Sequence, residues 1–299
     1  LTLLRKMIAR HPCVLAGPDT GAAPSIALQW RNYAQSLGGL HEKYFNLQPD
    51  YVAETMGRFL ETILRAEGET RIILEKTSLN VAAFDALATI LPGAKFLHVV
   101  RDGRDVAVSC LTPPFADLYD KGNVYEVAVR WRHAIHCCRR AKRFLGPDRF
   151  FELRYEDLTA DPETMVRRLC AFLGEEFEPR MLDYHRSATK HVARGDTSFH
   201  QRTKEAVNRG RVERWRSDAT PDFIAGFEGV AARELQDFGY PLSGITPPTR
   251  QQVRILYERL RPRRLLKNYK PPGGRSAEKR PPTKPAGGDD EERARAAGG

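Results

Sequence analysis

The alternation of apolar and polar positions along the 299-residue chain predicts helices separated by short strands. Apolar residues recur every three to four positions in the helical stretches and run almost continuously in the strands, as in a sheet covered on both faces. The predicted helices lie near 2–10, 51–66, 79–91, 103–111, 124–145, 161–173 and 220–238, and the predicted strands near 71–75, 95–100 and 149–153. The stretches 13–50 and 190–211 are less regular, and the first of them could line a ligand cleft.

Strands that alternate with helices predict an α/β fold with three layers, in which helices flank a central parallel sheet. Ligands of such sheets bind at the carboxyl ends of the strands. With 41% hydrophobic residues, the chain can bury one core of this kind. We expect one domain over 1–243, a basic extension over 244–268 that contains a short amphipathic helix, and a disordered tail over 269–299.

The positive charge is concentrated in the C-terminal segment. The formal net charge is +10, and residues 244–299 hold 14 Lys and Arg against 6 Asp and Glu. The rest of the chain is nearly balanced, with 34 basic against 32 acidic side chains. We therefore expect no nucleic-acid surface on the body. A basic tail can contact an anionic membrane, but we favour a solvated charge run.

The run 95–109 holds the most informative chemistry. A buried strand ends in the segment Arg-Asp-Gly-Arg, which opens directly into a helix. Asp102 or Asp105 can accept hydrogen bonds from the free amides of the first helical turn. The Arg101 guanidinium and the Ser109 hydroxyl, about two turns into the helix, can then bind one phosphate. In the alternative, Arg101 only caps the sheet edge and pairs with one of the two aspartates.

This segment resembles the 3'-phosphate-binding segment of sulfotransferases that use 3'-phosphoadenosine 5'-phosphosulfate (PAPS). Other stretches resemble the same family in the same order. Residues 1–12 resemble the helix after the 5'-phosphosulfate loop, with Thr2 as the last residue of that loop. Glu-Lys-Thr-Ser at 75–78 resembles the segment that brings a lysine to the sulfuryl group, and Arg-Tyr-Glu-Asp-Leu at 154–158 resembles the segment whose tyrosine contacts the adenine side. The resemblance implies a P-loop-like sulfotransferase fold with these cofactor-binding residues: Thr2, Arg101, Ser109 and Tyr155.

Within this family, the chain resembles the tyrosylprotein sulfotransferases most. The cytosolic enzymes carry a histidine base after Lys-Thr, where this chain has Ser78. The tyrosylprotein enzymes use a glutamate after a His-Pro pair, and Asp19 stands at that place. The late segment 207–215, which folds over the cofactor in the family, keeps the pattern of that branch. Gly21 and Glu213 depart from it.

The resemblance implies a PAPS-dependent transferase in which Lys76 and Asp19 are catalytic. Lys76 would stabilise charge on the leaving phosphate, and Asp19 would accept the proton of the acceptor hydroxyl. No metal is implied, since the eight histidines show no ligand spacing that indicates a site. The implied acceptor is a hydroxyl of a protein, with tyrosine first, of a glycan or of a small molecule.

Two other classes of function stay open. The chain could be a non-catalytic module that binds 3'-phosphoadenosine, or a P-loop kinase, although it has no Gly-x-x-x-x-Gly-Lys-Ser/Thr run. The five cysteines neither demand nor exclude a disulfide, and a homodimer is an open alternative.

The compartment is also open. No apolar run reaches the ~18 residues of a membrane span. Because Thr2 matches the end of the phosphosulfate loop, we expect the start of that loop, and any signal or anchor, upstream of Leu1. The location would be the Golgi lumen for a eukaryotic tyrosylprotein-type enzyme and the cytoplasm for a bacterial one.

Overall fold

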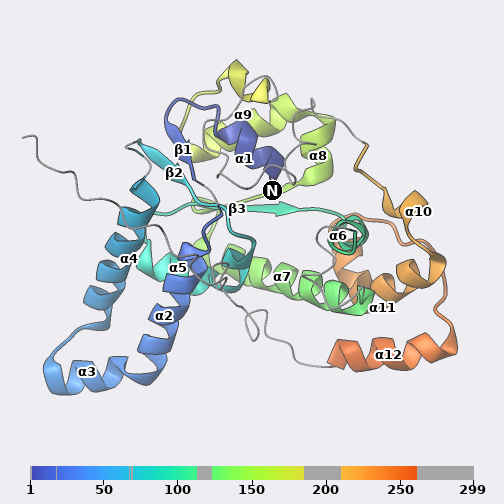
Figure 1. The fold of residues 1–299 in the computed structure, drawn as a ribbon, viewed down its shortest axis with the longest axis horizontal. Helices are drawn as coiled ribbons and strands as arrows, with labels where there is room; N and C mark the ends of the chain where they lie inside the picture. The colour runs from blue at the N-terminus through green and yellow to red at the C-terminus, as the bar shows by residue number, and fades with distance from the viewer. Residues whose placement is uncertain are drawn as a thin grey trace, which may run out of the picture. The chain divides into compact units, whose positions relative to one another are not determined.

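A computed structural model describes residues 2–17, 19–66, 68, 70–112, 123–184 and 210–260. The elements are shown in Figure 1. In chain order they are α1 (Thr2–Ile8), β1 (Val14–Ala16), α2 (Ala22–Ser36), α3 (Gly38–Phe45), α4 (Pro49–Arg65), β2 (Ile72–Leu74), the 3-10 helix η1 (Ser78–Ala82), α5 (Phe84–Ile90), β3 (Phe96–Val100), α6 (Gly103–Cys110), α7 (Val124–Leu145), β4 (Phe150–Arg154), α8 (Tyr155–Ala160), α9 (Pro162–Leu173), the 3-10 helix η4 (Pro179–Met181), α10 (Trp215–Asp218), α11 (Pro221–Asp237) and α12 (Thr249–Leu260).

All strands of the described residues pair in parallel. β1 pairs with β2, with Val14 opposite Ile72, and β3 pairs with β4, with Phe96 opposite Phe150. Parallel neighbours need crossover connections, and helices provide them here. The α/β class predicted from the alternation of strands and helices is therefore confirmed.

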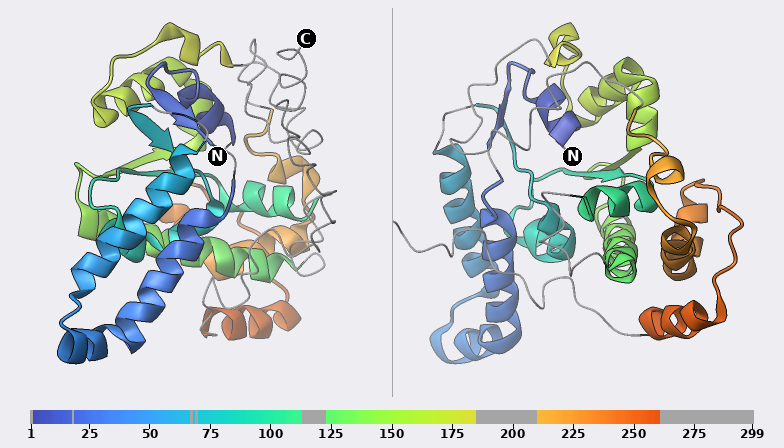
Figure 2. Two further views of the ribbon diagram at one scale, coloured as in Figure 1. Left: turned by 60° about the vertical axis from the view of Figure 1, so that its left-hand side comes forward. Right: turned by 45° about the vertical axis from the view of Figure 1, so that its right-hand side comes forward.

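Helices cover both faces of the β3–β4 pair, as Figure 2 shows. Phe96 of β3 points into a cluster with α2, α5 and α7, where Phe84 meets it edge to face at 5.3 Å between ring centroids. The next residue, Leu97, points to the opposite face and packs with residues of α1 and α9. This alternation produces the three layers, because successive side chains of a strand leave on opposite faces.

The expectation of an irregular stretch over 13–50 is wrong. That stretch contains β1, α2, α3 and the start of α4. α2 packs on α4 and α5 through Ala23, Ala27 and Trp30, all of which are buried. Gly21 precedes α2 in the left-handed region, at φ 69°, and offers no side-chain cap. Because small residues make up most of the buried face and Trp30 is its one large buried side chain, the sequence pattern there is weak.

The helix predicted over 79–91 is divided in two. η1 ends at Ala82 and α5 begins at Phe84, because Ala83 between them has a non-helical backbone at φ −123° and ψ 13°. The other predicted helices and strands lie within a few residues of their expected positions.

α12 forms where the basic extension was expected to be helical. Its Ile255 is buried against α11 at Gly229, where an added Cβ would lie 2.3 Å from the Ile255 Cδ1 atom. α12 also contacts α7, so it belongs to the same compact unit as the strands. Within the residues that the structure describes, none of the helices is both long and apolar enough to cross a membrane. The expected tail from 269 onward lies outside the described residues.

Candidate functional site

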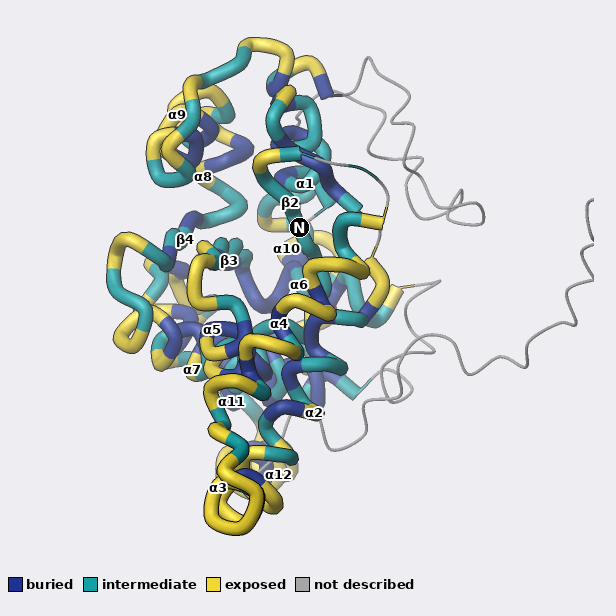
Figure 3. Tube along the Cα trace, turned by 90° about the vertical axis from the view of Figure 1, so that its left-hand side faces the viewer, coloured by how far each residue is buried: buried dark blue, intermediate teal, exposed yellow. Residues whose placement is uncertain are grey.

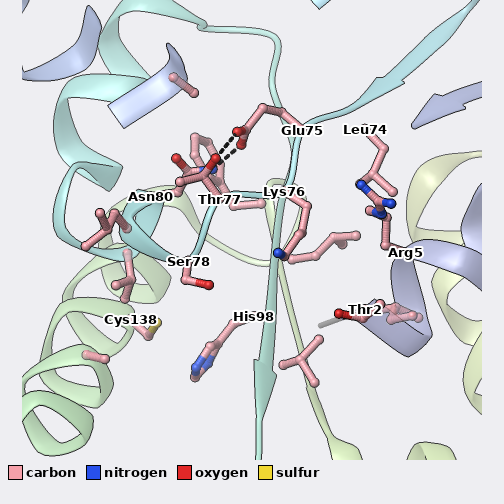
Figure 4. Close-up of a pocket in the computed structure, with 18 of the residues that line it drawn as sticks. Thr2, Arg5, Leu74, Glu75, Lys76, Thr77, Ser78, Asn80, His98 and Cys138 are labelled. Atoms are coloured by element: carbon pink, nitrogen blue, oxygen red, sulfur yellow. Dashed lines mark hydrogen bonds between the residues drawn. The ribbon is translucent and has the colours of Figure 1, made fainter. Parts of the chain in front are cut away.

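A cavity of about 1240 Å³ lies among the strands, α1, α6 and α7. Residues of β2 and β3, and the residues that follow each strand, line it. Five of the six predicted site residues line it: Thr2, Lys76, Arg101, Ser109 and Tyr155. Figure 4 shows how Thr2, Lys76 and His98 approach it from α1, from the loop after β2 and from β3. Lys76, Arg101 and Tyr155 each come after the carboxyl end of a strand, which is where parallel sheets bind ligands.

The turn after β3 is held rigidly. Asp102 is the N-cap of α6 and accepts a hydrogen bond from the Arg104 amide at 2.9 Å. The Arg104 side chain is 1% exposed and pairs with Asp102 at 2.7 Å and with Glu228 of α11 at 2.6 Å. Gly103 lets α6 approach its neighbours, since an added Cβ would lie 2.4 Å from a ring carbon of Phe227. Of the two aspartates that could cap the helix, Asp102 does so.

Arg101 lies at the centre of the site. Its Nη2 atom donates to the Arg211 carbonyl at 2.6 Å, and its guanidinium lies 5.0 Å from the centre of the Tyr155 ring. The Asp105 carboxylate is 3.4 Å away, so the pairing considered as an alternative is present. The Nε atom of Arg101 is nevertheless buried, with no hydrogen-bond partner in the described part of the chain. A buried donor without a partner is costly, and a bound anion would satisfy it.

Asp105 tethers the late segment to α6. One carboxylate oxygen accepts the Glu213 amide at 3.0 Å, and the other accepts the Trp215 amide at 2.9 Å. Burial raises the pKa of Asp105, and the Arg101 charge opposes that shift. Glu213 has φ 60°, an uncommon conformation for a residue with a side chain, which these contacts hold in place. Its own carboxylate is exposed and pairs with Arg216 at 3.1 Å, and the Arg216 cation offsets the negative charge of Glu213.

Tyr155 begins α8 directly after β4. Burial raises the pKa of its phenol, so the ring is neutral at physiological pH. The ring contributes to the same part of the cavity as Arg101, while Ser109 reaches it from α6 and Thr2 from the start of α1. Val207 and Asn208 of the late segment, and most of the expected flap over 190–211, lie outside the described residues.

Asp19 and Lys76, predicted as the catalytic pair, are brought together. Asp19 follows β1 and Lys76 follows β2, and because these strands are parallel neighbours their ends meet. The Lys76 Nζ atom lies 2.9 Å from the Asp19 Oδ2 atom. Thr77 donates to the Asp19 Oδ1 atom, also at 2.9 Å. Both charged side chains keep contact with solvent, with exposures of 21% for Lys76 and 41% for Asp19.

Sequence reasoning assigned no role to three polar residues at this site, which are Glu75, Asn80 and Arg5. Glu75 contacts Thr77 at 2.5 Å and also accepts a hydrogen bond from Asn80. Burial raises the pKa of Glu75, the Thr77 and Asn80 hydrogen bonds oppose that shift, and the Asp19 charge adds to it. Arg5 lines the cavity from α1 and donates to the Gly17 carbonyl at 2.8 Å. The spacing of three between Thr2 and Arg5 puts both on one helix face, and that signal could have indicated Arg5.

A second polar cluster joins β3, β4 and α7, and its His98 lines the cavity. The His98 Nδ1 atom is 2.9 Å from one Glu152 oxygen, and Lys142 of α7 donates to the other at 3.0 Å. The His98 hydrogen bond is the main reason why the pKa of Glu152 falls to about 2, and Lys142 adds to the effect against the opposing effect of burial. This cluster ties β3, β4 and α7 together.

Among the described residues, one group of side chains has the spacing of a metal site: His11, Cys13 and Glu175, whose ligand atoms lie within 4.8 Å of one another. Both His11 ring nitrogens already have partners. Nδ1 accepts from the Cys13 amide at 3.2 Å, and Nε2 lies 3.0 Å from the Glu176 carbonyl. These contacts favour a structural role for His11, in which it joins the chain before β1 to the segment after α9.

The arrangement agrees with a comparison of the chain with known families. A model of the sulfotransferase family matches residues 2–179, more than half of the chain. The chain belongs to the sulfotransferase family. It is 26% identical over 247 residues to a protein-tyrosine sulfotransferase of Drosophila melanogaster, an alignment that covers 80% of this chain and 49% of the relative. Protein-tyrosine sulfotransferase A of Caenorhabditis elegans is 22% identical, with 80% and 64% covered.

Solved structures show the same fold. The sulfotransferase domain of the olefin synthase of Synechococcus PCC 7002 superposes with a TM-score of 0.58 at 23% identity, covering 81% of this chain and 90% of that domain. The chain spans about half to two thirds of the length of the two protein-tyrosine sulfotransferases named above.

Proposed function

We propose that this protein transfers a sulfuryl group from PAPS to an acceptor hydroxyl. The observation that carries the proposal is the ion pair between Asp19 and Lys76, 2.9 Å apart, in which Lys76 lines the same cavity as Arg101. A carboxylate can accept the proton of the attacking hydroxyl, and an ammonium can stabilise charge on the leaving oxygen. In-line transfer to a hydroxyl uses both groups in one place.

The residues around Arg101 support a nucleotide site. The partnerless Nε of Arg101 is a donor for a phosphate, and Ser109 lines the same cavity. The neutral Tyr155 ring offers a face for the adenine side, and Thr2 at the start of α1 offers a hydroxyl to the 5' end. We assign these four residues to the donor nucleotide and assign no metal to the reaction.

In the proposed step, the acceptor oxygen forms a bond to sulfur while the bond from sulfur to the bridging phosphate oxygen breaks. Adenosine 3',5'-bisphosphate leaves, and the proton of the acceptor hydroxyl passes to Asp19. Lys76 supplies positive charge where the leaving oxygen becomes negative. The contact between Asp19 and Lys76 must open when the substrates enter, which their partial exposure allows.

For the acceptor we propose tyrosine of a protein as the first candidate, because named relatives of that activity align over 80% of this chain. A small-molecule acceptor is the second candidate. The observation that favours it is a match of 29% identity, over 48% of this chain, to an omega-hydroxy-beta-dihydromenaquinone-9 sulfotransferase of Mycobacterium tuberculosis.

Transfer of ³⁵S from labelled PAPS tests the proposal with the full-length protein. The acceptors are an acidic tyrosine peptide and a panel of phenols, alcohols and sugars, and binding of adenosine 3',5'-bisphosphate is measured by calorimetry. We expect Lys76→Ala to lower kcat about 100-fold or more and to change the nucleotide Kd less than about 3-fold. Arg101→Ala should instead raise that Kd about 10- to 100-fold, because it removes charge-assisted hydrogen bonds.

Three outcomes would count against the proposal. Nucleotide binding without transfer to any acceptor would favour a binding module. No nucleotide binding at all would contradict the donor assignment. Labelling of sugars or alcohols but not of the peptide would reject tyrosine and keep the reaction.

A further inference from the structure

The Thr77 hydroxyl lies between two carboxyl groups. Its oxygen is 2.5 Å from Glu75 Oε1 and 2.9 Å from Asp19 Oδ1. Figure 4 shows Glu75, Thr77 and Asn80 grouped beside Lys76. A hydroxyl has one proton to donate, so Thr77 cannot serve two ionised carboxylates at once. A separation of 2.5 Å between oxygens needs a proton between them. One of the two carboxyls must therefore carry a proton of its own.

The surroundings show which carboxyl is protonated. Asp19 has the Lys76 ammonium at 2.9 Å as its counter-ion. In the described residues, the hydrogen-bond partners of Glu75 are Thr77 and Asn80, both of them neutral. Asn80 donates to the Glu75 Oε2 atom, which leaves Oε1 as the oxygen that holds the proton. Burial raises the pKa of Glu75, and the nearby Asp19 charge raises it further, although three hydrogen bonds, from the side chains of Thr77 and Asn80 and from the Thr77 backbone, oppose this.

Other charged groups near this loop face elsewhere. Arg31 of α2, which packs on η1, donates to the Ala82 carbonyl and pairs with Asp85. Arg65 at the end of α4 donates to the Thr70 carbonyl. Glu75 is thus a carboxyl without a cationic partner in the described structure, beside one that has such a partner.

We propose that Glu75 is a positioning residue that acts as a neutral acid: it donates to Thr77, and Thr77 in turn donates to Asp19, which stays ionised. This inference rests on the proposed function of Asp19 as the base. The chain of hydrogen bonds commits Asp19 Oδ1 to Thr77 and leaves Oδ2, the oxygen nearest Lys76, to accept the acceptor proton. It also keeps a second negative charge away from a sulfuryl group that is itself surrounded by negative oxygens.

Two pairs of variants test the proposal in the full-length protein. Glu75→Gln keeps a neutral donor for Thr77 and an acceptor for Asn80, and we expect it to retain kcat within about 3-fold. Glu75→Leu removes both and should lower kcat at least 10-fold. Thr77→Ser keeps the hydroxyl and should keep kcat, whereas Thr77→Val should lower kcat 10-fold or more. All four should leave the Kd of adenosine 3',5'-bisphosphate within about 3-fold, since the effect is on the base and not on donor binding.

A second measurement does not depend on transfer. The ¹³C resonance of the Glu75 carboxyl, assigned by its loss in Glu75→Gln, reports the protonation of this group as pH is varied. We expect a midpoint above the pH at which transfer is assayed, and so well above the ordinary value of about 4.3, because the proposal requires a neutral Glu75 at that pH. Asp19→Asn should lower that midpoint by removing a negative charge, and Thr77→Val should shift it by removing the hydroxyl that accepts the Glu75 proton.

The outcomes separate this inference from the function on which it rests. If the wild type transfers sulfate but Glu75→Gln loses 100-fold in kcat, Glu75 acts as an ion and the inference is wrong. A Glu75 midpoint below the pH of the transfer assay overturns it as well, because Glu75 would then be ionised when the protein acts. If no acceptor is sulfated, the proposed function fails, and the resonance alone decides whether the three residues share a proton: a midpoint that ignores both Asp19→Asn and Thr77→Val shows that they do not.

Discussion

Replacement of Arg104 by methionine should be among the most destabilising single changes in this protein. The Arg104 guanidinium is almost fully buried, contacts Asp102 twice, and reaches Glu228 and the Pro241 carbonyl. It also stacks on Trp215, 3.8 Å from the ring centre. One side chain therefore joins the turn after β3 to α11, to α10 and to the segment that follows α11.

The magnitude follows from the charges left behind. Methionine fills much of the same volume, so loss of packing is small, but Asp102 and Glu228 remain buried without their cation, at 6% and 7% side-chain exposure. Removing one partner of a buried ion pair costs about 3–5 kcal/mol. Both carboxylates keep other hydrogen bonds, Asp102 to the backbone of α6 and Glu228 to Ser243, which favours the lower half of this range. We expect a loss of about 3–4 kcal/mol, out of a total of about 5–15 kcal/mol for a typical domain.

Urea unfolding followed by circular dichroism measures this loss. With a slope of about 2–3 kcal/mol/M, the midpoint should fall by roughly 1–2 M. Arg58→Met provides the control, because the pair between Arg58 and Glu54 is exposed, at 59% and 64%, and such pairs contribute less than about 1 kcal/mol. If Arg104→Met shifts the midpoint no more than Arg58→Met does, the buried network does not stabilise the fold and the reasoning is wrong.

Three further predictions concern a close contact, a ring and a pH window. Gly57→Ala should destabilise the fold by about 1–3 kcal/mol, because an added Cβ would lie 1.9 Å from the Ile90 carbonyl oxygen. Gly39→Ala in helix α3 is the control, since an added Cβ there has free space and should stabilise the fold by up to about 1 kcal/mol. Thermal unfolding compares the two variants, and equal shifts in Tm would contradict the clash. If the Tyr155 ring stacks on the nucleotide, Tyr155→Phe should keep the nucleotide Kd within about 3-fold, while Tyr155→Leu should raise it about 10-fold. Calorimetry measures both values, and similar Kd values for the two variants would argue against stacking. The pKa of Glu152 is lowered from 4.5 to about 2, so the ionised Glu152 stabilises the fold at neutral pH, and this stabilisation is lost as pH falls through that interval. Glu152→Gln should therefore lower the free energy of unfolding by about 2 kcal/mol at pH 7 and little at pH 2. Urea midpoints at both pH values measure this, and a difference that does not depend on pH would refute the assignment.

The region of α2 and α3 shows where pattern reading failed. Figure 3 shows α3 largely exposed, and large apolar residues such as Tyr44 and Phe45 lie at its surface, 64% and 72% exposed. At the same time, alanines occupy the buried face of α2. Local hydrophobicity is thus a weak guide to burial here, and a sequence pattern that assumes large apolar side chains inside cannot locate these two helices.

The sequence by itself determined what depends on local periodicity and on motifs. The strand at 96–100, the helix at 124–145 and the basic turn at Arg101 each rest on consecutive residues, and each is where the pattern predicted. The family could also be read from short segments that keep their order along the chain, and the family model bears this out.

Only the tertiary structure decided which side chains meet. Asp19 and Lys76 are 57 residues apart, and they meet because β1 and β2 are parallel neighbours. The protonated state inferred for Glu75 has the same origin. Its burial and its closeness to Asp19 come from the packing of separate elements, and no spacing along the chain encodes either of them.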